Sequence, residues 1–246
     1  MNIIGETIAW LTNPAHWTGP NGIPTRLLEH LLLSGAAFAI AMAIALPIGL
    51  AVGHTGRGAS FAINLANLGR AIPTLATIGI VAPLTQALDP ALGFTVYPTL
   101  IGLVVLALPP VLVNAYSGVA GVDRDLVEAA RGMGLHERQI LTAIEIPISL
   151  PVILAGLRLA AVAIVATATL GAIFGFGGLG RYLVDGIAQN DDGQLFGGVV
   201  LAAGLTLLTE AGFALLQRGA ESPGLRRATP EAAPRDGAPT APGQRR

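Results

Sequence analysis

The charged residues of this chain gather in one short stretch, residues 123–145. Eight of them fall there: Asp123, Arg124, Asp125, Glu128, Arg131, Glu137, Arg138 and Glu145. Only 12% of the chain is charged, whereas a soluble domain typically carries about 25%. A charged helix displayed between long apolar runs is a natural docking element for a soluble partner. The chemistry that this cluster predicts is therefore recognition of another protein.

The sequence lacks the residue patterns of catalytic and metal sites. The chain has no Cys, which excludes disulfides, thiolate metal sites and a cysteine nucleophile. Its four histidines are scattered over loops and helix ends, at His16, His30, His54 and His136. Neither a metal-ligand spacing nor a Ser/His/Asp set can be drawn from them. We expect no catalytic residue, no metal and no cofactor, and the net charge of −1 gives no field for nucleic acid.

Long runs without charge surround the cluster and must position it. Five such runs cover residues 31–53, 71–88, 90–122, 159–180 and 193–209. Runs of about 18 residues or more can cross a hydrocarbon core roughly 30 Å thick. The sequence therefore predicts an all-α, polytopic integral membrane protein rather than a soluble helical domain.

The predicted membrane spans number about five. They lie at about 27–52, 72–88, 98–118, 150–174 and 195–216. The second is the weakest, because it is short and is interrupted by Pro73 and Pro83. We expect three parts of the chain: an extracytoplasmic or interfacial segment at 1–26, a transmembrane domain at 27–216 with a cytoplasmic loop at 123–146, and a disordered cytoplasmic tail at 217–246.

The distribution of arginine predicts the orientation in the membrane. All 14 basic residues are Arg, and most of those in loops lie in the 123–146 loop and the 217–246 tail. Positive loops stay in the cytoplasm. We therefore expect a multi-pass protein of the cytoplasmic (inner) membrane, with the N-terminus outside and the charged loop and C-terminus inside.

The charged loop also carries a motif with fixed spacing. Glu128, Ala129 and Ala130 are followed after three residues by Gly134, and after nine more by Ile144-Glu145-Ile146-Pro147. This pattern resembles the EAA motif of ABC-importer permeases, which reads E-A-A, three residues, G, nine residues, I, one residue, L-P. The one departure is Ile146 where Leu is usual. The resemblance extends over roughly residues 27–216.

The resemblance implies the type I importer permease fold, with a minimal core of five helices. It also implies that the loop forms a short coupling helix seated on an ABC ATPase. The residues expected to carry this coupling are Glu128, Ala129, Ala130, Arg131, Gly134, Ile144 and Pro147. Small alanines let a partner approach, Gly134 can end the helix, and Pro147 suits the first turn of the next helix. The implied partners are ATPase subunits, an extracytoplasmic substrate-binding protein and a second permease chain, identical or paralogous.

Other stretches are similar to permeases for quaternary-amine osmoprotectants such as glycine betaine, carnitine and choline. They are Glu29-His30-Leu31, Leu46-Pro47-Ile48-Gly49, the runs 70–75, 108–118 and 155–158, and the glycine-rich run 175–180. Methionine-type and other amino-acid permeases share parts of this pattern and stay open as an alternative. A stand-alone secondary transporter is a further alternative, although the uncharged spans offer few groups that could couple an ion.

The residues expected to line the translocation pathway are few. Pro73 and Thr74 begin a proline-broken helix, and Asn114 and Tyr116 lie late in the third span. Packing between helices is the competing interpretation for the last two. Arg158 lies among apolar residues and is expected to have a structural role, by reaching the membrane surface or by pairing with Glu145 or a partner residue.

Overall fold

The computed structural model describes residues 2–60, 63–64, 69 and 72–220, and every regular element within them is helical. The elements are α1 (Ile3–Thr12), a 3-10 turn (Pro14–Trp17), α2 (Ile23–Thr55), α4 (Thr74–Leu88), α5 (Val96–Ala120), α6 (Arg124–Gly132), α7 (Glu137–Ile140), a π-helical turn (Leu141–Glu145), α8 (Ile146–Thr167), a 3-10 turn (Ala168–Phe174), α9 (Gly180–Gln189) and α10 (Asp192–Ala220). The all-α prediction is confirmed.

Four helices in the described residues are long and apolar enough to cross a membrane. They are Ile23–Thr55, Val96–Ala120, Glu137–Phe174 and Asp192–Gly219. The second predicted span corresponds to α4, which has only 15 residues and is therefore ~22 Å long. The part of the chain that the structure describes thus holds four helices long enough to span a membrane and two shorter apolar helices, α1 and α4.

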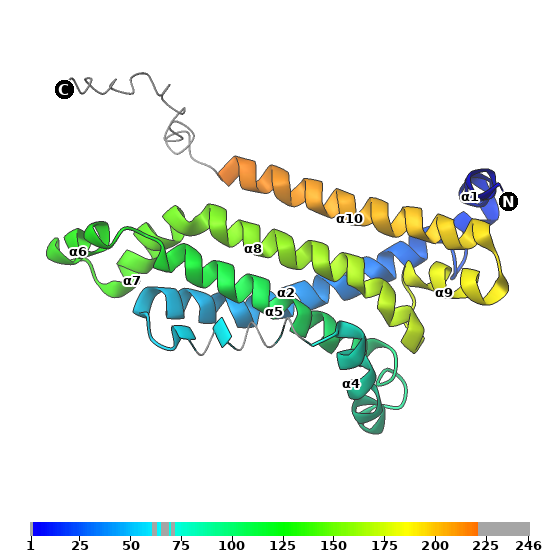
Figure 1. Ribbon diagram of the computed structural model, residues 1–246, viewed down its shortest axis with the longest axis horizontal. Helices are drawn as coiled ribbons and strands as arrows, with labels where there is room; N and C mark the ends of the chain where they lie inside the picture. The colour runs from blue at the N-terminus through cyan, green and yellow to red at the C-terminus, as the bar shows by residue number, and fades with distance from the viewer. Residues whose placement is uncertain (1, 61–62, 65–68, 70–71, 221–246) are drawn as a thin grey trace, which may run out of the picture.

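Helices α2, α5 and α8 lie side by side and form the centre of the bundle, with α10 on the far side of α8 (Figure 1). Small residues of α2 face α5 at every fourth position: Ala37, Ala41, Ala45, Gly49 and Gly53, all buried. A side chain at Gly49 would meet the Leu112 carbonyl at 2.8 Å. Helices in lipid associate through this kind of close packing, because the hydrophobic effect does not drive them together there.

Helix α4 departs from the bundle, as Figure 1 shows at its lower right. It contacts α5 near its own start, where Ile78 fills the space beside Gly102. Its other face carries exposed Ile80, Leu84 and Leu88. An apolar face of this kind needs lipid or another chain to cover it.

The bundle has two ends, which we call the α1 end and the α6 end. The α1 end holds α1, which packs on α10, together with α9 (Figure 1). Helix α9 was not predicted from the sequence. The α6 end holds α6, α7 and the C-terminal turn of α2. Residues 221–246, which include most of the predicted tail, lie outside the described residues.

Candidate functional site

The α6 end carries the predicted docking element as a short helix with a defined start. Asp123 caps α6, its side chain accepting a hydrogen bond from the Asp125 backbone N–H at 2.9 Å. Asp125 lies in the first turn and Arg131 in the last. Both charges are placed favourably for the helix dipole.

Gly134 ends α6 in the way the sequence predicted. Its φ of +85° is left-handed. The Leu135 N–H bonds the Ala130 carbonyl and the Gly134 N–H bonds the Arg131 carbonyl, which is the hydrogen-bond pattern of a Schellman motif. Leu135 then packs on the small apolar cluster under α6. The turn fixes the direction in which the chain enters α7.

Helix α6 has a buried side and an exposed side. Val127 and Ala130 are buried against Ile140 of α7, and Ile144 lies at the edge of this cluster. Beside this buried side, Leu126, Ala129 and Met133 stay exposed, with Met133 74% exposed. The three are spaced i, i+3 and i+7 and so form one apolar strip. The predicted coupling alanines therefore separate: Ala130 anchors the helix and Ala129 faces outward.

Helix α6 also carries charged side chains. Glu128 is exposed on it. Arg131 makes two hydrogen bonds to Glu137, of 2.7 and 2.9 Å, which raise the pKa of Arg131 above its ordinary value. Arg131 is thus engaged within the chain and orients α6 on α7.

Glu137, the partner of Arg131, also contacts His54, and this contact was not predicted from the sequence. Glu137 Oε2 lies 3.1 Å from His54 Nε2, and His54 Nδ1 lies 2.5 Å from Glu145 Oε2. Glu145 is 2% exposed. His54 had been set aside as one of four scattered histidines. Its place at the end of the first span, on the side of the charged loop, was the signal that could have linked it to the loop.

The second half of the predicted loop proves to be continuous with the following membrane helix. A helix begins at Glu137 and reaches Phe174. It passes through a π-helical turn, in which the Ile146 N–H bonds the Leu141 carbonyl. Pro147 follows directly as the second residue of α8, where its missing N–H is tolerated beside the altered register. Helical turns joined directly to a membrane helix give α6 a stiff base.

The predicted pathway residues do not form one cluster. Pro73 caps α4 and is exposed, and Thr74 lies beside Gly102 of α5. Asn114 is twelve residues further along α5, a rise of ~18 Å. There it bonds the Pro110 carbonyl of its own helix and abuts Gly156 of α8. For Asn114 this contact matches the packing interpretation, and the pathway assignments stay predictions.

Arg158 has a partner on a neighbouring helix. It hydrogen-bonds Glu210 of α10, and its other terminal nitrogen lies 3.4 Å from Gln217. Glu145, the partner considered from the sequence, is occupied by His54. Pairing is the usual way in which a membrane helix accommodates a charge, so Arg158 joins α8 to α10. The first two residues of the run 70–75 lie outside the described residues.

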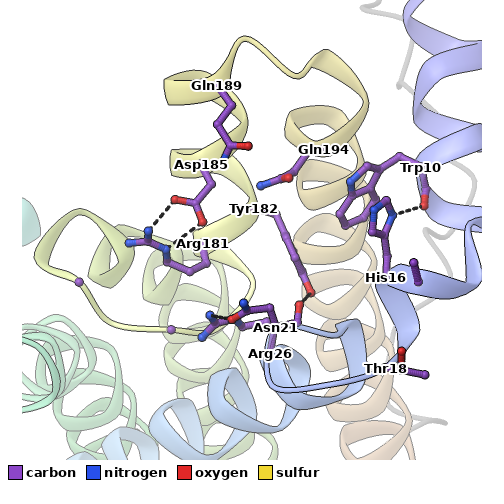
Figure 2. Close-up of a pocket in the computed structure, with 13 residues that line it drawn as sticks. Trp10, His16, Thr18, Asn21, Arg26, Arg181, Tyr182, Asp185, Gln189 and Gln194 are labelled. Atoms are coloured by element: carbon purple, nitrogen blue, oxygen red, sulfur yellow. Dashed lines mark hydrogen bonds and ion pairs between the residues drawn. The ribbon is translucent and has the colours of Figure 1, made fainter.

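The α1 end contains a cavity of about 600 Å³ between α9, the start of α2 and the N-terminal segment (Figure 2). Arg181 and Asp185 face one another across one turn of α9, joined by two hydrogen bonds. Tyr182 donates its hydroxyl proton to the Asn21 carbonyl at 2.7 Å. Burial raises the pKa of Tyr182 to about 12, so this donor keeps its proton at neutral pH.

The aromatic side chains of this cavity are already engaged. Trp10 stacks on His16 with ring centroids 4.5 Å apart and meets Tyr182 edge-on at 5.0 Å. A cation held by cation–π attraction needs an open ring face. The cavity therefore offers polar groups and an ion pair to a ligand. These groups suit a polar segment of another protein better than a quaternary amine.

Helix α2 also holds the glycine-rich segment at the α1 end, a contact not foreseen from the sequence. Glu29 accepts hydrogen bonds from Arg26 and from the Gly178 N–H, both at 2.8 Å. His30 is fully buried and bonds the Val165 carbonyl at 2.9 Å through Nε2. These hydrogen bonds explain why two polar residues, Glu29 and His30, can lie near the start of an apolar membrane helix.

Comparisons with solved structures find the same fold in a known transporter. The chain is similar to the methionine ABC transporter MetNI in two inward-facing crystal forms. One match has a TM-score of 0.72 at 20% identity and covers 86% of this chain and all of that chain. The other has a TM-score of 0.69 at 21% identity, with 79% and 94% covered.

Sequence comparisons identify the family. Residues 28–221 match the model of the binding-protein-dependent transport system inner membrane component, and the chain belongs to this family. It is a multi-pass inner-membrane permease subunit and not an enzyme. The EAA-type interpretation of the sequence is confirmed at the level of the family.

Several curated relatives cover most of the chain. It is 35% identical to the carnitine transport permease protein OpuCB of Listeria monocytogenes, over 74% of this chain and 80% of that protein. It is 30% identical to the glycine betaine/carnitine/choline transport system permease protein OpuCB of Bacillus subtilis, over 80% and 88%. The osmoprotectant import permease protein OsmW of Salmonella typhimurium is 30% identical, over 74% and 84%.

Proposed function

We propose that this chain is the membrane-spanning subunit of an ATP-driven importer and that α6 is the helix on which its ATPase acts. The observation that carries this proposal is the exposed apolar strip of α6, on a helix that also exposes Glu128 and that is set on a stiff helical base. A membrane protein has little reason to display such a strip outside its spans unless a partner covers it. The motif spacing and the family support the same assignment.

The cargo is proposed to be a quaternary-amine osmoprotectant of the glycine betaine, carnitine and choline class. The support is that relatives at 30–35% identity are named as permeases for these compounds. Only 5% of the chain is aromatic, which suits a passage route whose affinity comes from a separate binding protein. The resemblance to the methionine transporter, at 20% identity, supports the fold alone.

The assembly is proposed to contain two permease chains, two ATPases and one binding protein. The ATPases would bind the α6 end in the cytoplasm. The binding protein would bind the outer loops around residues 89–97 and 181–192, and the polar cavity is lined in part by the second of these segments (Figure 2). The arginine-rich loop and tail support this orientation.

Uptake of labelled solutes tests the cargo. Cells with and without the gene are compared for uptake of glycine betaine, carnitine and choline at low and high osmolarity, with methionine as the control. We expect deletion to remove uptake of at least one quaternary amine and to leave methionine uptake unchanged. Loss of methionine uptake, or no loss at all, would contradict the proposed cargo.

A bulky substitution tests the docking face. Ala129→Phe places a large ring on the exposed strip, and Ala51→Phe is the matched control because Ala51 is exposed on α2 within the membrane span. We expect Ala129→Phe to reach the membrane at the wild-type level but to lose uptake and to release the ATPase during purification. Retention of both by Ala129→Phe would refute α6 as the docking helix.

A further inference from the structure

His54 is the point at which α2 meets the two helices of the α6 end. It lies in the last turn of α2 and is about one-tenth exposed as a side chain. One ring nitrogen faces buried Glu145 at 2.5 Å and the other faces Glu137 at 3.1 Å. Both carboxylates belong to the helix that begins at Glu137. The histidine therefore fastens this helix to α2 at two points.

The number of hydrogen bonds that this contact can form depends on how many N–H groups the ring carries. An ionised carboxylate only accepts hydrogen bonds, and a neutral imidazole has a single N–H donor. The imidazolium form has two donors and also supplies a positive charge between two negative ones. Both contacts can be hydrogen bonds to ionised carboxylates only when both ring nitrogens of His54 carry a proton.

The contact continues into α6. Glu137, which faces His54, also accepts two hydrogen bonds from Arg131. The order of contacts is thus Glu145, His54, Glu137 and Arg131, and it passes from the base of α8 through α2 to the last turn of α6. The apolar cluster under α6 consists of residues of its own loop and of the helix that follows it. His54 adds the polar connection between this unit and α2.

Helix α2 is long enough to link the contact at His54 to the opposite side of the membrane. It has 33 residues, a length of about 50 Å. Buried Gly53, next to His54, packs against the Tyr116 carbonyl of α5. At its other end Glu29 holds the Gly178 N–H. A displacement delivered at His54 therefore reaches a long helix whose far end holds the glycine-rich segment.

We propose that His54 is a positioning residue, which fixes the angle of α6 and α7 relative to α2 so that force on α6 is passed to α2. This inference rests on the proposed function of α6 as the ATPase-docking helix. The competing explanation is local: His54 would merely satisfy the buried carboxylate of Glu145. The two explanations differ for a variant in which Glu145 keeps a hydrogen-bond donor but the contact with Glu137 is lost. The local explanation expects no loss of transport in that variant, whereas our proposal expects a loss.

Two substitutions separate these explanations. His54→Gln can donate one amide hydrogen bond to Glu145 but carries no charge for Glu137. His54→Lys keeps a cation with three donors on a flexible stem and can serve both carboxylates. His16→Ala, a histidine change at the opposite end of the molecule, is the control. Thermal unfolding is measured for each variant so that a loss of stability is recorded separately.

The first measurement is independent of transport. Because the chain has no Cys, spin labels can be placed at Met133→Cys on α6 and Ala51→Cys on α2, both exposed sites. Distances between them are measured by pulsed electron resonance in lipid nanodiscs. We expect one narrow distance for the wild type, His54→Lys and His16→Ala, and a broad distribution for His54→Gln. An unchanged distribution in His54→Gln overturns the proposal.

The second measurement uses the whole importer, with its ATPase and binding protein, in proteoliposomes. We expect His54→Gln to unfold near the wild-type temperature and to keep basal ATPase activity, while uptake per ATP hydrolysed falls at least tenfold and His54→Lys restores it. Equal losses of stability, ATPase activity and uptake would show a local structural role and overturn the proposal. If the wild type itself fails to transport, the proposed function fails, and the distance measurement still decides the role of His54.

Discussion

At the scale of single residues, Gly134 shows how one backbone conformation sets the shape of the proposed docking helix, α6. Its φ is +85°, and a Cβ built there meets nothing within 4 Å. Any effect of a side chain must therefore come from the backbone. Gly132, two residues earlier in the last turn of α6, has equally open space but ordinary helical geometry.

These two glycines give a matched prediction. Gly134→Ala should destabilise the end of α6 by roughly 1–2 kcal/mol, because an L-residue is strained in the left-handed region. Gly132→Ala should be neutral or stabilising by up to about 1 kcal/mol, because Ala favours a helix over Gly. Hydrogen–deuterium exchange of the segment 123–136 measures both. Equal exchange in the two variants would contradict the role given to the turn.

Charged residues illustrate the limit of reasoning from sequence at this scale. Arg158 and Glu145 were considered as possible partners, 13 positions apart on one helix. The structure gives each a different partner on another helix: Glu210 for Arg158 and His54 for Glu145. Which charges meet depends on how helices are placed side by side, and spacing along one chain does not contain that information.

At the scale of elements, the contact between α2 and α5 depends on small residues at every fourth position of α2. A Cβ at Gly53 would lie 2.8 Å from both the Tyr116 carbonyl oxygen and the Val119 Cβ. Gly35 lies on the same helix, and a Cβ there meets nothing within 4 Å. The same substitution at these two positions therefore probes packing alone.

Gly53→Ala should force α2 and α5 apart and destabilise the bundle by roughly 1–3 kcal/mol, as overpacking does in well-packed cores. Gly35→Ala should leave stability unchanged or raise it slightly, since Ala favours a helix. Thermal unfolding of the purified permease in detergent compares the two. A midpoint for Gly53→Ala as high as that of Gly35→Ala would show that the helices are not in close contact.

At the scale of the whole molecule, the two ends of the bundle differ in character. The α6 end presents a charged, protruding helix, and the α1 end presents a polar cavity with an ion pair (Figures 1 and 2). An importer needs different partners on its two sides. This asymmetry agrees with the orientation proposed from arginine.

Labelling of single cysteines tests that orientation. Because the native chain has no Cys, Met133→Cys and Gln189→Cys each introduce one thiol, at opposite ends of the bundle. We expect a membrane-impermeant maleimide to label Gln189→Cys in spheroplasts and Met133→Cys only in inside-out vesicles. The reverse pattern would place the N-terminus in the cytoplasm and refute the proposed topology.

The sequence by itself determined the class of fold, most of the spans and the position of the charged loop between them. These follow from local quantities: the length of uncharged runs, the need of a buried backbone for helical hydrogen bonds in lipid, and motif spacing within one loop. The left-handed turn at Gly134 also depends only on residues that are close in the sequence, so it could be predicted. The family match and the helices confirm the class of fold and four of the predicted spans.

Only the tertiary structure decided which face of α6 is free, that Ala130 is buried while Ala129 is exposed, and that His54 joins Glu137 to Glu145. It also decided that Glu29 and His30 hold a segment about 149 positions away in the chain. These contacts join residues on different helices, and they depend on the rotation and depth of each helix in the bundle. Hydropathy and spacing do not fix those two quantities, because in lipid the packing of small residues sets them.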